Sequence, residues 1–222
     1  MSGKLIVFEG TDGSGKSTQF RLLTQTLEEK GRRFQKLVFP QYDQPSSALI
    51  RMYLGGEFGK NPADVNAYAA SAFYAVDRYA SMKQVWGNYY KEGGLILTDR
   101  YTTSNAVHQA VKCPKAERQD FLQWLDDFEH NKLGLPRPNL VIYLDMPTAQ
   151  AVTLMRQREV DTKTKADIHE LDTAYLATCR ECALEAADVL GWHKINCLDD
   201  SGRIRSIEDI QQEIWALVSP HL

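Results

Sequence analysis

The chain of 222 residues is 43% hydrophobic and 25% charged, the balance of a globular domain and not of a disordered segment. With 26 Lys and Arg against 29 Asp and Glu, its net charge of −3 argues against a broad single-sign field, and so against nucleic acid or a membrane as partner. Its apolar runs are far shorter than the ~20 residues that cross a bilayer, and the N-terminal run is too short for a secretory signal, so we expect a cytoplasmic protein.

Short β-branched or apolar runs alternate along the chain with longer stretches of helical period. That alternation is typical of a parallel sheet covered by helices on both faces. The predicted strands are 4–9, 34–39, 94–99, 139–145 and 192–197. The predicted helices are 16–30, 45–56, 62–91, 101–112, 115–132, 147–158, 168–190 and 206–218. We therefore predict an α/β three-layer sandwich with a five-stranded parallel sheet, forming a single domain over residues 1–222.

Residues 157–167 fit neither pattern, since they are polar, basic and nearly free of apolar side chains. Taken alone, such a stretch is best explained as a solvated surface loop. Its place between two helical patterns predicts a mobile surface segment.

Four cysteines, Cys113, Cys179, Cys182 and Cys197, do not make a disulfide framework in a chain of this size. Cys179 and Cys182 are three residues apart inside a helix-forming stretch, and no second pair completes a zinc site. We interpret them as small residues of a helix face, in preference to a metal or redox site.

The strongest motif follows the first predicted strand and opens a helix. Its spelling and position both match the loop that binds nucleoside triphosphates. In such a loop the backbone N–H groups turn toward phosphate oxygens, Lys16 reaches the β- and γ-phosphates and the Ser17 hydroxyl ligates Mg²⁺. The residues predicted to bind ATP are Gly10, Thr11, Asp12, Gly13, Ser14, Gly15, Lys16, Ser17 and Thr18.

A phosphate-binding loop leaves open whether the protein is a switch, a motor or a transferase. A guanine-reading Asn-Lys-x-Asp is lacking, because the near match at 131–134 ends in Gly and precedes a strand. The chain is too short for a motor core. It offers instead a second cluster of phosphate-directed and aromatic residues, which a transferase needs for its acceptor.

The third predicted strand ends in Asp99, Arg100 and Tyr101, at the sheet edge where such folds bind ligands. Asp99 could hold Mg²⁺ through water, and the planar fork of Arg100 could hold two phosphoryl groups. The alternative is a buried structural Asp–Arg pair. Asp145, at the end of the fourth strand, is a weaker candidate for the metal because no basic residue stands beside it in the sequence.

Taken together, five motifs make the chain resemble the thymidylate kinases from end to end. They are the loop with Asp12 inside it, Phe39-Pro40, the run 74–78, the run 99–101 followed by Ser104-Asn105, and the run 167–170. The resemblance implies the P-loop NTPase fold with a short mobile lid at about 157–168. It also implies phosphorylation of dTMP to dTDP with ATP and Mg²⁺, and a homodimer.

For the acceptor base, the resemblance implies that Tyr74 stacks on thymine and that Arg78 hydrogen-bonds a base carbonyl. Phe73 is an alternative stacker, and ordinary core packing of an aromatic helix face is the alternative to both. Ser104 and Asn105 match positions that face the base edge. The positions matching the sugar and 5′-phosphate wall are Phe39, Pro40 and Tyr42.

Further roles follow from the resemblance alone. Asp12 matches an acid near the sugar 3′-hydroxyl and the acceptor phosphate, and Arg100 clamps phosphoryl groups. Either Arg158 or Lys163 supplies the closing charge of the lid, because Gly13 replaces the basic loop residue of some relatives. Asp167, His169 and Glu170 match residues that cap the next helix and contact the acceptor or its Mg²⁺. Asp167 is also a candidate metal ligand, together with Ser17 and Asp99.

Two departures affect the acceptor. His108 stands where many relatives have a Tyr near the sugar 2′ position, which weakens the steric argument for deoxyribose. Gln41 and Tyr42 replace an arginine of some members. The alternative functions are a kinase for another pyrimidine nucleotide or a nucleoside, and, from another class, a nucleotide-binding switch without an acceptor site.

Overall fold

The computed structural model describes residues 3–61, 64–162 and 173–222. The chain divides into two compact units. The first comprises Met1–Val7 and Phe34–Asn139, and the second comprises Phe8–Arg33 and Leu140–Leu222. The single domain over 1–222 with a lid at 157–168 stays a prediction.

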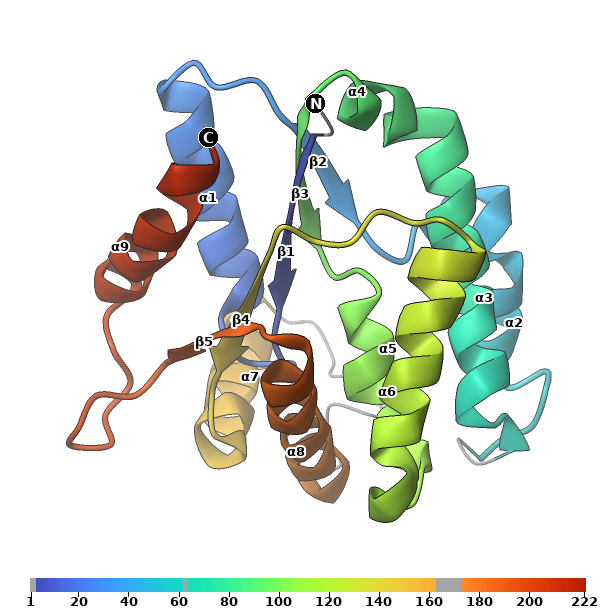
Figure 1. Cartoon of the computed structure of the whole chain (residues 1–222). Coiled ribbons are helices and arrows are strands. Elements are labelled where there is room, and N and C mark those ends of the chain that lie inside the picture. Colours follow the sequence, from blue (N-terminus) through green and yellow to red (C-terminus); the bar gives the residue numbers. More distant parts are fainter. Residues whose placement is uncertain (1–2, 62–63, 163–172) are drawn as a thin grey trace. The chain divides into compact units, whose positions relative to one another are not determined.

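Five parallel strands form one sheet, in the order β2-β3-β1-β4-β5. Their bounds, labelled in Figure 1, are β1 Lys4–Glu9, β2 Gln35–Val38, β3 Leu95–Asp99, β4 Leu140–Asp145 and β5 His193–Asn196. β2 and β3 pair in parallel with Val38 opposite Asp99, and β4 and β5 with Asp145 opposite Asn196. Each strand lies within one residue of its predicted bounds, and the α/β prediction is confirmed.

The central strands are apolar on both faces, as expected for parallel strands covered by helices. Residues 5–8 of β1 and 142–144 of β4 are fully buried. These continuous runs place the chain's core along the strands. They also bring the polar residues that follow each strand to the carboxyl end of the sheet.

The helices of the first unit are shorter and more interrupted than predicted. They are η1 Pro45–Ser47, α2 Ala48–Leu54, α3 Ala67–Ser81, η3 Met82–Trp86, α4 Gly87–Lys91, α5 Thr103–His108, η4 Ala110–Lys112, η5 Lys115–Glu117, α6 Arg118–Asp126 and η6 Asp127–Lys132. Within the described residues, the predicted helix 62–91 begins at Ala67, where the Asn66 side chain accepts the Ala69 N–H at 2.8 Å. It is broken by the π-helical turn η3, after which a Cβ on Gly87 would lie 2.4 Å from the Met82 carbonyl oxygen.

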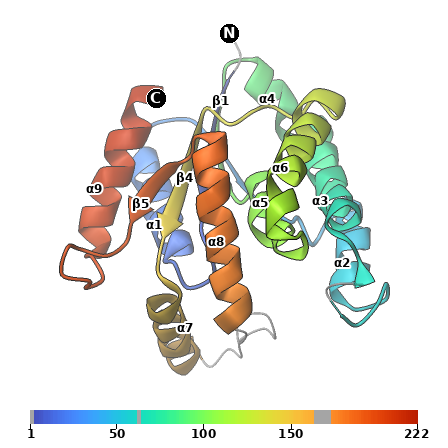
Figure 2. The ribbon, with the colours of Figure 1, turned by 60° about the horizontal axis from the view of Figure 1, so that its bottom comes forward.

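The second unit has the helices α1 Lys16–Glu29, α7 Thr148–Thr162, α8 Thr173–Leu190, α9 Ile207–Val218 and η7 Ser219–His221. α1 packs on α9, where Gln19 Nε2 donates to the Ile207 carbonyl at 2.9 Å, and α7 packs on α8 (Figure 2). α7 continues past its predicted end at 158, as far as Thr162.

Two smaller expectations can be compared with the fold. Cys179 and Cys182 are buried on α8, as predicted for residues of a helix face. Of the helices in the described ranges, none combines the length and apolar character needed to cross a membrane.

Candidate active site

The loop between β1 and α1 has the backbone of a phosphate cradle. Gly13 and Gly15 take left-handed φ angles of 79° and 81°, which residues with a Cβ rarely adopt. Gly15 is also the N-cap of α1, so the first N–H groups of the helix face the loop. The Ser14 N–H donates to the Thr11 carbonyl at 3.1 Å and closes the turn. The loop therefore collects backbone donors and the positive end of the α1 dipole at one place.

Contacts of buried residues fix the start of the loop. Buried Glu9, which the sequence analysis did not single out, accepts the Gly10 N–H at 3.0 Å. A Cβ on Gly10 would lie 2.5 Å from the Ser14 Oγ. That Oγ is buried and has no hydrogen-bond partner in the described part of the chain. Because an orphaned buried hydroxyl is costly, it marks a place where a ligand oxygen fits.

Ser17 and Asp99 carry oxygen donors of the kind that Mg²⁺ prefers, and each lies in a different unit. Ser17 is exposed in the first turn of α1, and Asp99 is nearly buried at the end of β3. Across residues 3–61, 64–162 and 173–222, no group of three or more His, Cys, Asp or Glu could hold a metal by itself. A cation that takes phosphate oxygens and water as further ligands needs no such cage.

In the first unit, the carboxyl ends of β2 and β3 bring several predicted residues together. The Phe39 N–H donates to the Asp99 carbonyl at 3.1 Å. Arg100 has a left-handed φ of 67°, and its carbonyl accepts from the Thr98 hydroxyl at 2.7 Å. Arg100 Nη1 and His108 Nε2 are 2.7 Å apart. Since guanidinium only donates, that ring nitrogen accepts, and His108 is neutral here with its proton on Nδ1.

Asp77 organises the segment after Phe39 and Pro40. Buried on α3, it accepts the Gln41 N–H at 2.8 Å and the Ser46 hydroxyl at 2.6 Å. Arg51 Nη1 donates to the Tyr42 carbonyl at 2.5 Å. The Tyr42 side chain itself stays exposed. The backbone that carries Tyr42 is thus held on two sides, a role for Asp77 that the sequence analysis missed.

Tyr74 and Phe73 face different surroundings. Phe73 packs in an aromatic group, with ring centroids 6.3 Å from Tyr53 and 5.5 Å from Phe58. Burial raises the pKa of Tyr74, and the positive charges of Arg100 and Arg78 act against that rise. Of the two rings, Tyr74 is the one that shares its surroundings with the predicted acceptor residues.

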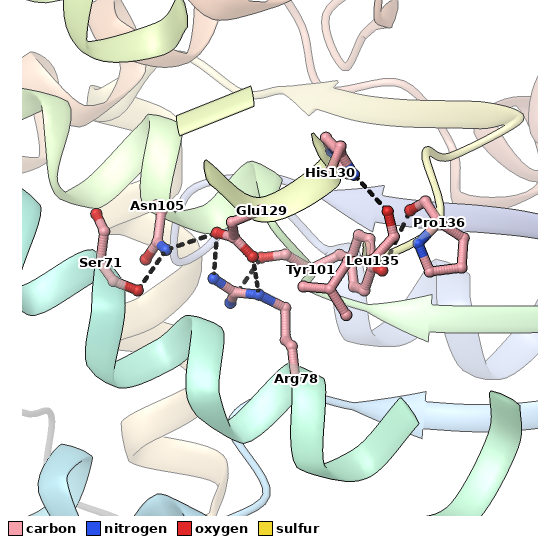
Figure 3. A network of polar contacts seen from close by, with 8 residues as sticks. All are labelled: Ser71, Arg78, Tyr101, Asn105, Glu129, His130, Leu135 and Pro136. Atoms are coloured by element: carbon pink, nitrogen blue, oxygen red, sulfur yellow. Dashed lines mark hydrogen bonds and ion pairs between the residues drawn. The ribbon is translucent and has the colours of Figure 1, made fainter. Parts of the chain in front are cut away.

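Four residues form a connected polar group, named here the Glu129 cluster: Ser71, Arg78, Asn105 and Glu129 (Figure 3). They come from α3, α5 and η6. Arg78 is 2% exposed and Glu129 is 0% exposed, and their side chains form a bidentate ion pair with N···O distances of 2.7 and 2.6 Å. Arg78 and Asn105, predicted separately from the sequence, are joined through a carboxylate that the sequence analysis missed.

A signal for Glu129 was present in the sequence. It follows Phe121 and Leu125 at helical spacing, and both of these side chains are buried. A carboxylate in line with an apolar stripe predicts a buried cationic partner. The partner, Arg78, is 51 residues away in the chain, so its identity required the fold.

The surroundings of Asp145 differ from those predicted. Its carboxylate is bound bidentately by Arg180 of α8, at 2.6 and 2.9 Å. The statement that Asp145 lacks a basic partner holds along the sequence and is wrong in space, because α8 returns to the end of β4. With both oxygens engaged by Arg180, Asp145 is a structural acid, which agrees with its lower rank as a metal ligand.

The remaining predicted residues are placed as follows. Asp12 is half-buried in the loop, Lys16 is buried at the start of α1, and Ser104 is half-buried on α5. Lys163, Asp167, His169 and Glu170 lie outside the described residues, as does the Arg158 side chain.

The comparisons with known proteins agree on one family. The family model described as thymidylate kinase matches residues 8–214. A probable thymidylate kinase of Pyrococcus horikoshii is 31% identical, over 100% of this chain and 98% of its own length. A thymidylate kinase of Mycobacterium tuberculosis is also 31% identical, over 76% of this chain and 78% of its own.

A solved structure supports the fold. The thymidylate kinase of Candida albicans superposes with a TM-score of 0.71, covering 100% of this chain and 94% of its own, at 21% identity. At that identity the match concerns the path of the chain and not its specificity.

Proposed function

The chain belongs to the thymidylate kinase family, and on that premise we propose that it transfers the γ-phosphoryl group of ATP to the 5′-phosphate of dTMP, yielding dTDP and ADP. The observation that carries the proposal is the presence of two chemically distinct sets of residues. One is a backbone cradle for a triphosphate. The other is Arg78 and Asn105, both buried and both bound to Glu129, with Tyr74 on the same helix as Arg78, a set suited to a planar base.

The donor side uses the loop over residues 10–18. Its N–H groups and the α1 N-terminus bind the phosphates, the orphaned Ser14 hydroxyl offers one more hydrogen bond, and Lys16 neutralises charge on the transferred group. Mg²⁺, when bound, adds charge neutralisation on the donor phosphates, with the Ser17 hydroxyl as ligand and Asp99 and Asp167 as further candidates.

The acceptor side needs no strong general base, because a nucleotide 5′-phosphate, with its second pKa near ~6, is mostly a dianion at neutral pH. Catalysis then depends on orientation and on charge. We assign base contacts to Tyr74, Arg78, Ser104 and Asn105, and sugar and phosphate contacts to Asp12, Phe39, Pro40, Tyr42, Arg100 and His108. Arg158 or Lys163, with His169 and Glu170, complete the assignment from the lid side.

A homodimer in the cytoplasm, without nucleic-acid or membrane partners, is part of the same proposal. It is supported by the family and by the near-balanced net charge of −3. Light scattering behind size-exclusion chromatography tests the dimer, and a monomer at micromolar concentration would remove it from the proposal.

The experiment that tests the activity is ADP release by the purified protein with ATP and Mg²⁺. Acceptors are added one at a time: dTMP, dUMP, dCMP, UMP, dGMP, AMP, thymidine and none. We expect clear preference for dTMP. Preference for another acceptor would keep a kinase and reject the assigned base contacts, whereas no acceptor-dependent release would reject the proposed reaction.

A further inference from the structure

Glu129 is a fully buried carboxylate at the centre of the first unit's polar interior, and the proposed function gives it no role. It lies in the π-helical turn η6, and the Leu135 N–H donates to its carbonyl at 3.0 Å. His130 Nδ1 lies 2.9 Å from the Leu135 carbonyl, to which it donates because a carbonyl only accepts (Figure 3). π-Helical turns recur at functional sites, where they set the direction of one side chain.

The carboxylate of Glu129 determines which N–H groups Arg78 has left to offer. Arg78 Nε and Nη2 donate to the two oxygens of Glu129, and Nη1 donates to the Tyr101 carbonyl at 3.2 Å. A guanidinium carries five N–H groups. These three contacts leave one on each terminal nitrogen, so the fixed fork presents donors only, the match for a carbonyl oxygen.

The same carboxylate determines the orientation of the Asn105 amide. Its Nδ2 donates to Glu129 Oε1 at 3.0 Å and to the Ser71 carbonyl at 3.2 Å, which uses both amide hydrogens. The reversed amide would set its oxygen against two acceptors. Its Oδ1 is therefore the atom left for a ligand, and it can only accept.

We propose that Glu129 is a positioning residue for base selection, and that it makes Arg78 a fixed donor and Asn105 a fixed acceptor. That pair complements the O4 acceptor and N3–H donor of thymine or uracil. It opposes cytosine, which has an N4 amino donor and an N3 acceptor at the same edge. The inference rests on the proposed function and deepens it, since it assigns to Glu129 the positioning of the two residues that read the base.

The test compares kcat/KM for dTMP, dUMP and dCMP in the wild type, in Glu129→Gln and in Asp127→Asn. Glu129→Gln replaces one acceptor with a donor, so Asn105 can reverse and Arg78 loses its bidentate partner. We expect the preference for dTMP over dCMP to fall about 10- to 100-fold, through a higher KM for dTMP. Asp127→Asn removes a carboxylate from an exposed pair with Lys132 in the same turn and should leave the preference unchanged.

The ratio separates positioning from mere stability. Loss of folded protein lowers turnover with both acceptors equally and leaves the ratio intact, so an unchanged ratio in Glu129→Gln would overturn the proposal. Glu129→Asp keeps the buried charge and should restore part of the preference. The KM for ATP should not change in any of the three variants.

A measurement on the wild type avoids any effect of a substitution on folding. N3-methyl-dTMP lacks the N3–H, and we expect its affinity in calorimetry to be about 10- to 100-fold below that of dTMP. Equal affinities would overturn the assignment of Asn105 as acceptor. Failure of the proposed function looks different, because the wild type would then phosphorylate none of the pyrimidine monophosphates.

Discussion

The phosphate-binding loop and the Glu129 cluster are built in opposite ways. The loop is nine consecutive residues whose chemistry lies mostly in backbone N–H groups and in glycine φ angles. The cluster is three side chains and the Ser71 carbonyl from three helical segments, with its central ion pair joining residues 51 positions apart. The loop can be recognised from its sequence alone, whereas the Glu129 cluster forms only after the first unit has folded.

This difference predicts different consequences of mutation. Residues of the loop are proposed to contact the phosphates of ATP, so their replacement should affect activity more than stability. The Glu129 cluster contains two buried charges, Arg78 and Glu129, that compensate each other, so replacing either should affect both activity and stability. The predictions below test that contrast.

Arg78→Met should have the largest effect, because it leaves the Glu129 carboxylate buried without its cation. We expect a loss of about 3–5 kcal/mol in the free energy of unfolding, measured by urea titration. The control Arg137→Met breaks an exposed pair with Asp126 and should cost less than about 1 kcal/mol.

The double variant R78M/E129L sharpens the same test. It removes both charges and should recover most of the lost stability while dTMP binding stays absent. Stability that remains as low as in the single variant would contradict the view that the uncompensated charge is the cause.

Lys16→Ala should lower kcat about 1,000-fold, because a charge that neutralises the transferred group is lost. Its free energy of unfolding should change by less than about 1 kcal/mol. Lys30→Ala, at the other end of α1 and over the Trp215 ring, is the matched control and should keep full turnover. A loss of stability in Lys16→Ala as large as in Arg78→Met would break the comparison.

Gly15→Ala and Gly31→Ala form a matched pair. Both glycines have left-handed φ angles, 81° and 65°, and a Cβ at either meets nothing within 4 Å. Each should lose about 1 kcal/mol of stability from backbone strain. Only Gly15→Ala should also weaken ATP binding, by about 10-fold in calorimetry, since its Cβ enters the phosphate cradle. Equal ATP affinities would mean that the loop does not bind the phosphates.

The smallest predicted effect is the pH dependence of the free energy of unfolding that comes from Lys112 in the first unit. Lys112 donates to the Tyr53 hydroxyl at 2.8 Å and the Val65 carbonyl at 2.9 Å, and burial lowers its pKa to about 8. The unfolded chain, with a lysine pKa of ~10.4, holds more protons between these values, so stability should rise with pH there.

The measurement is urea unfolding of the wild type and Lys112→Met at several pH values. From about pH 8 to about pH 10, the wild type should gain about 1 kcal/mol relative to the variant, a figure reduced for partial solvent screening. Lys91→Met, at an exposed position, should show no such trend. A flat difference for Lys112→Met would contradict its assigned burial.

The parts of the molecule that could be predicted from the sequence are those with local causes. Apolar runs fixed the five strands to within one residue, and the spacing of Gly13, Gly15 and Lys16 was sufficient for the loop. The extension of α7 to Thr162 was missed, because residues 159–162 carry no apolar repeat of helical period from which it could be predicted.

The parts that could not be predicted depend on pairing across the chain. Glu129 was hidden in a helix end, and the partner of Asp145, Arg180, lies 35 residues downstream. In both pairs the carboxylate and the guanidinium are evident in the sequence. Which acid pairs with which base depends on how the helices pack in the fold. The resemblance to a family supplied Arg78 and Asn105 without supplying what orients them.

Arg100 has one further consequence, through its left-handed backbone. An L-residue with a side chain in this region costs about 1–2 kcal/mol, whereas glycine does not. Selection for heat resistance alone would therefore favour glycine at this position and discard the guanidinium. The protein keeps an arginine where its backbone favours glycine, so its thermal tolerance and the charge proposed for catalysis are in competition at a single residue.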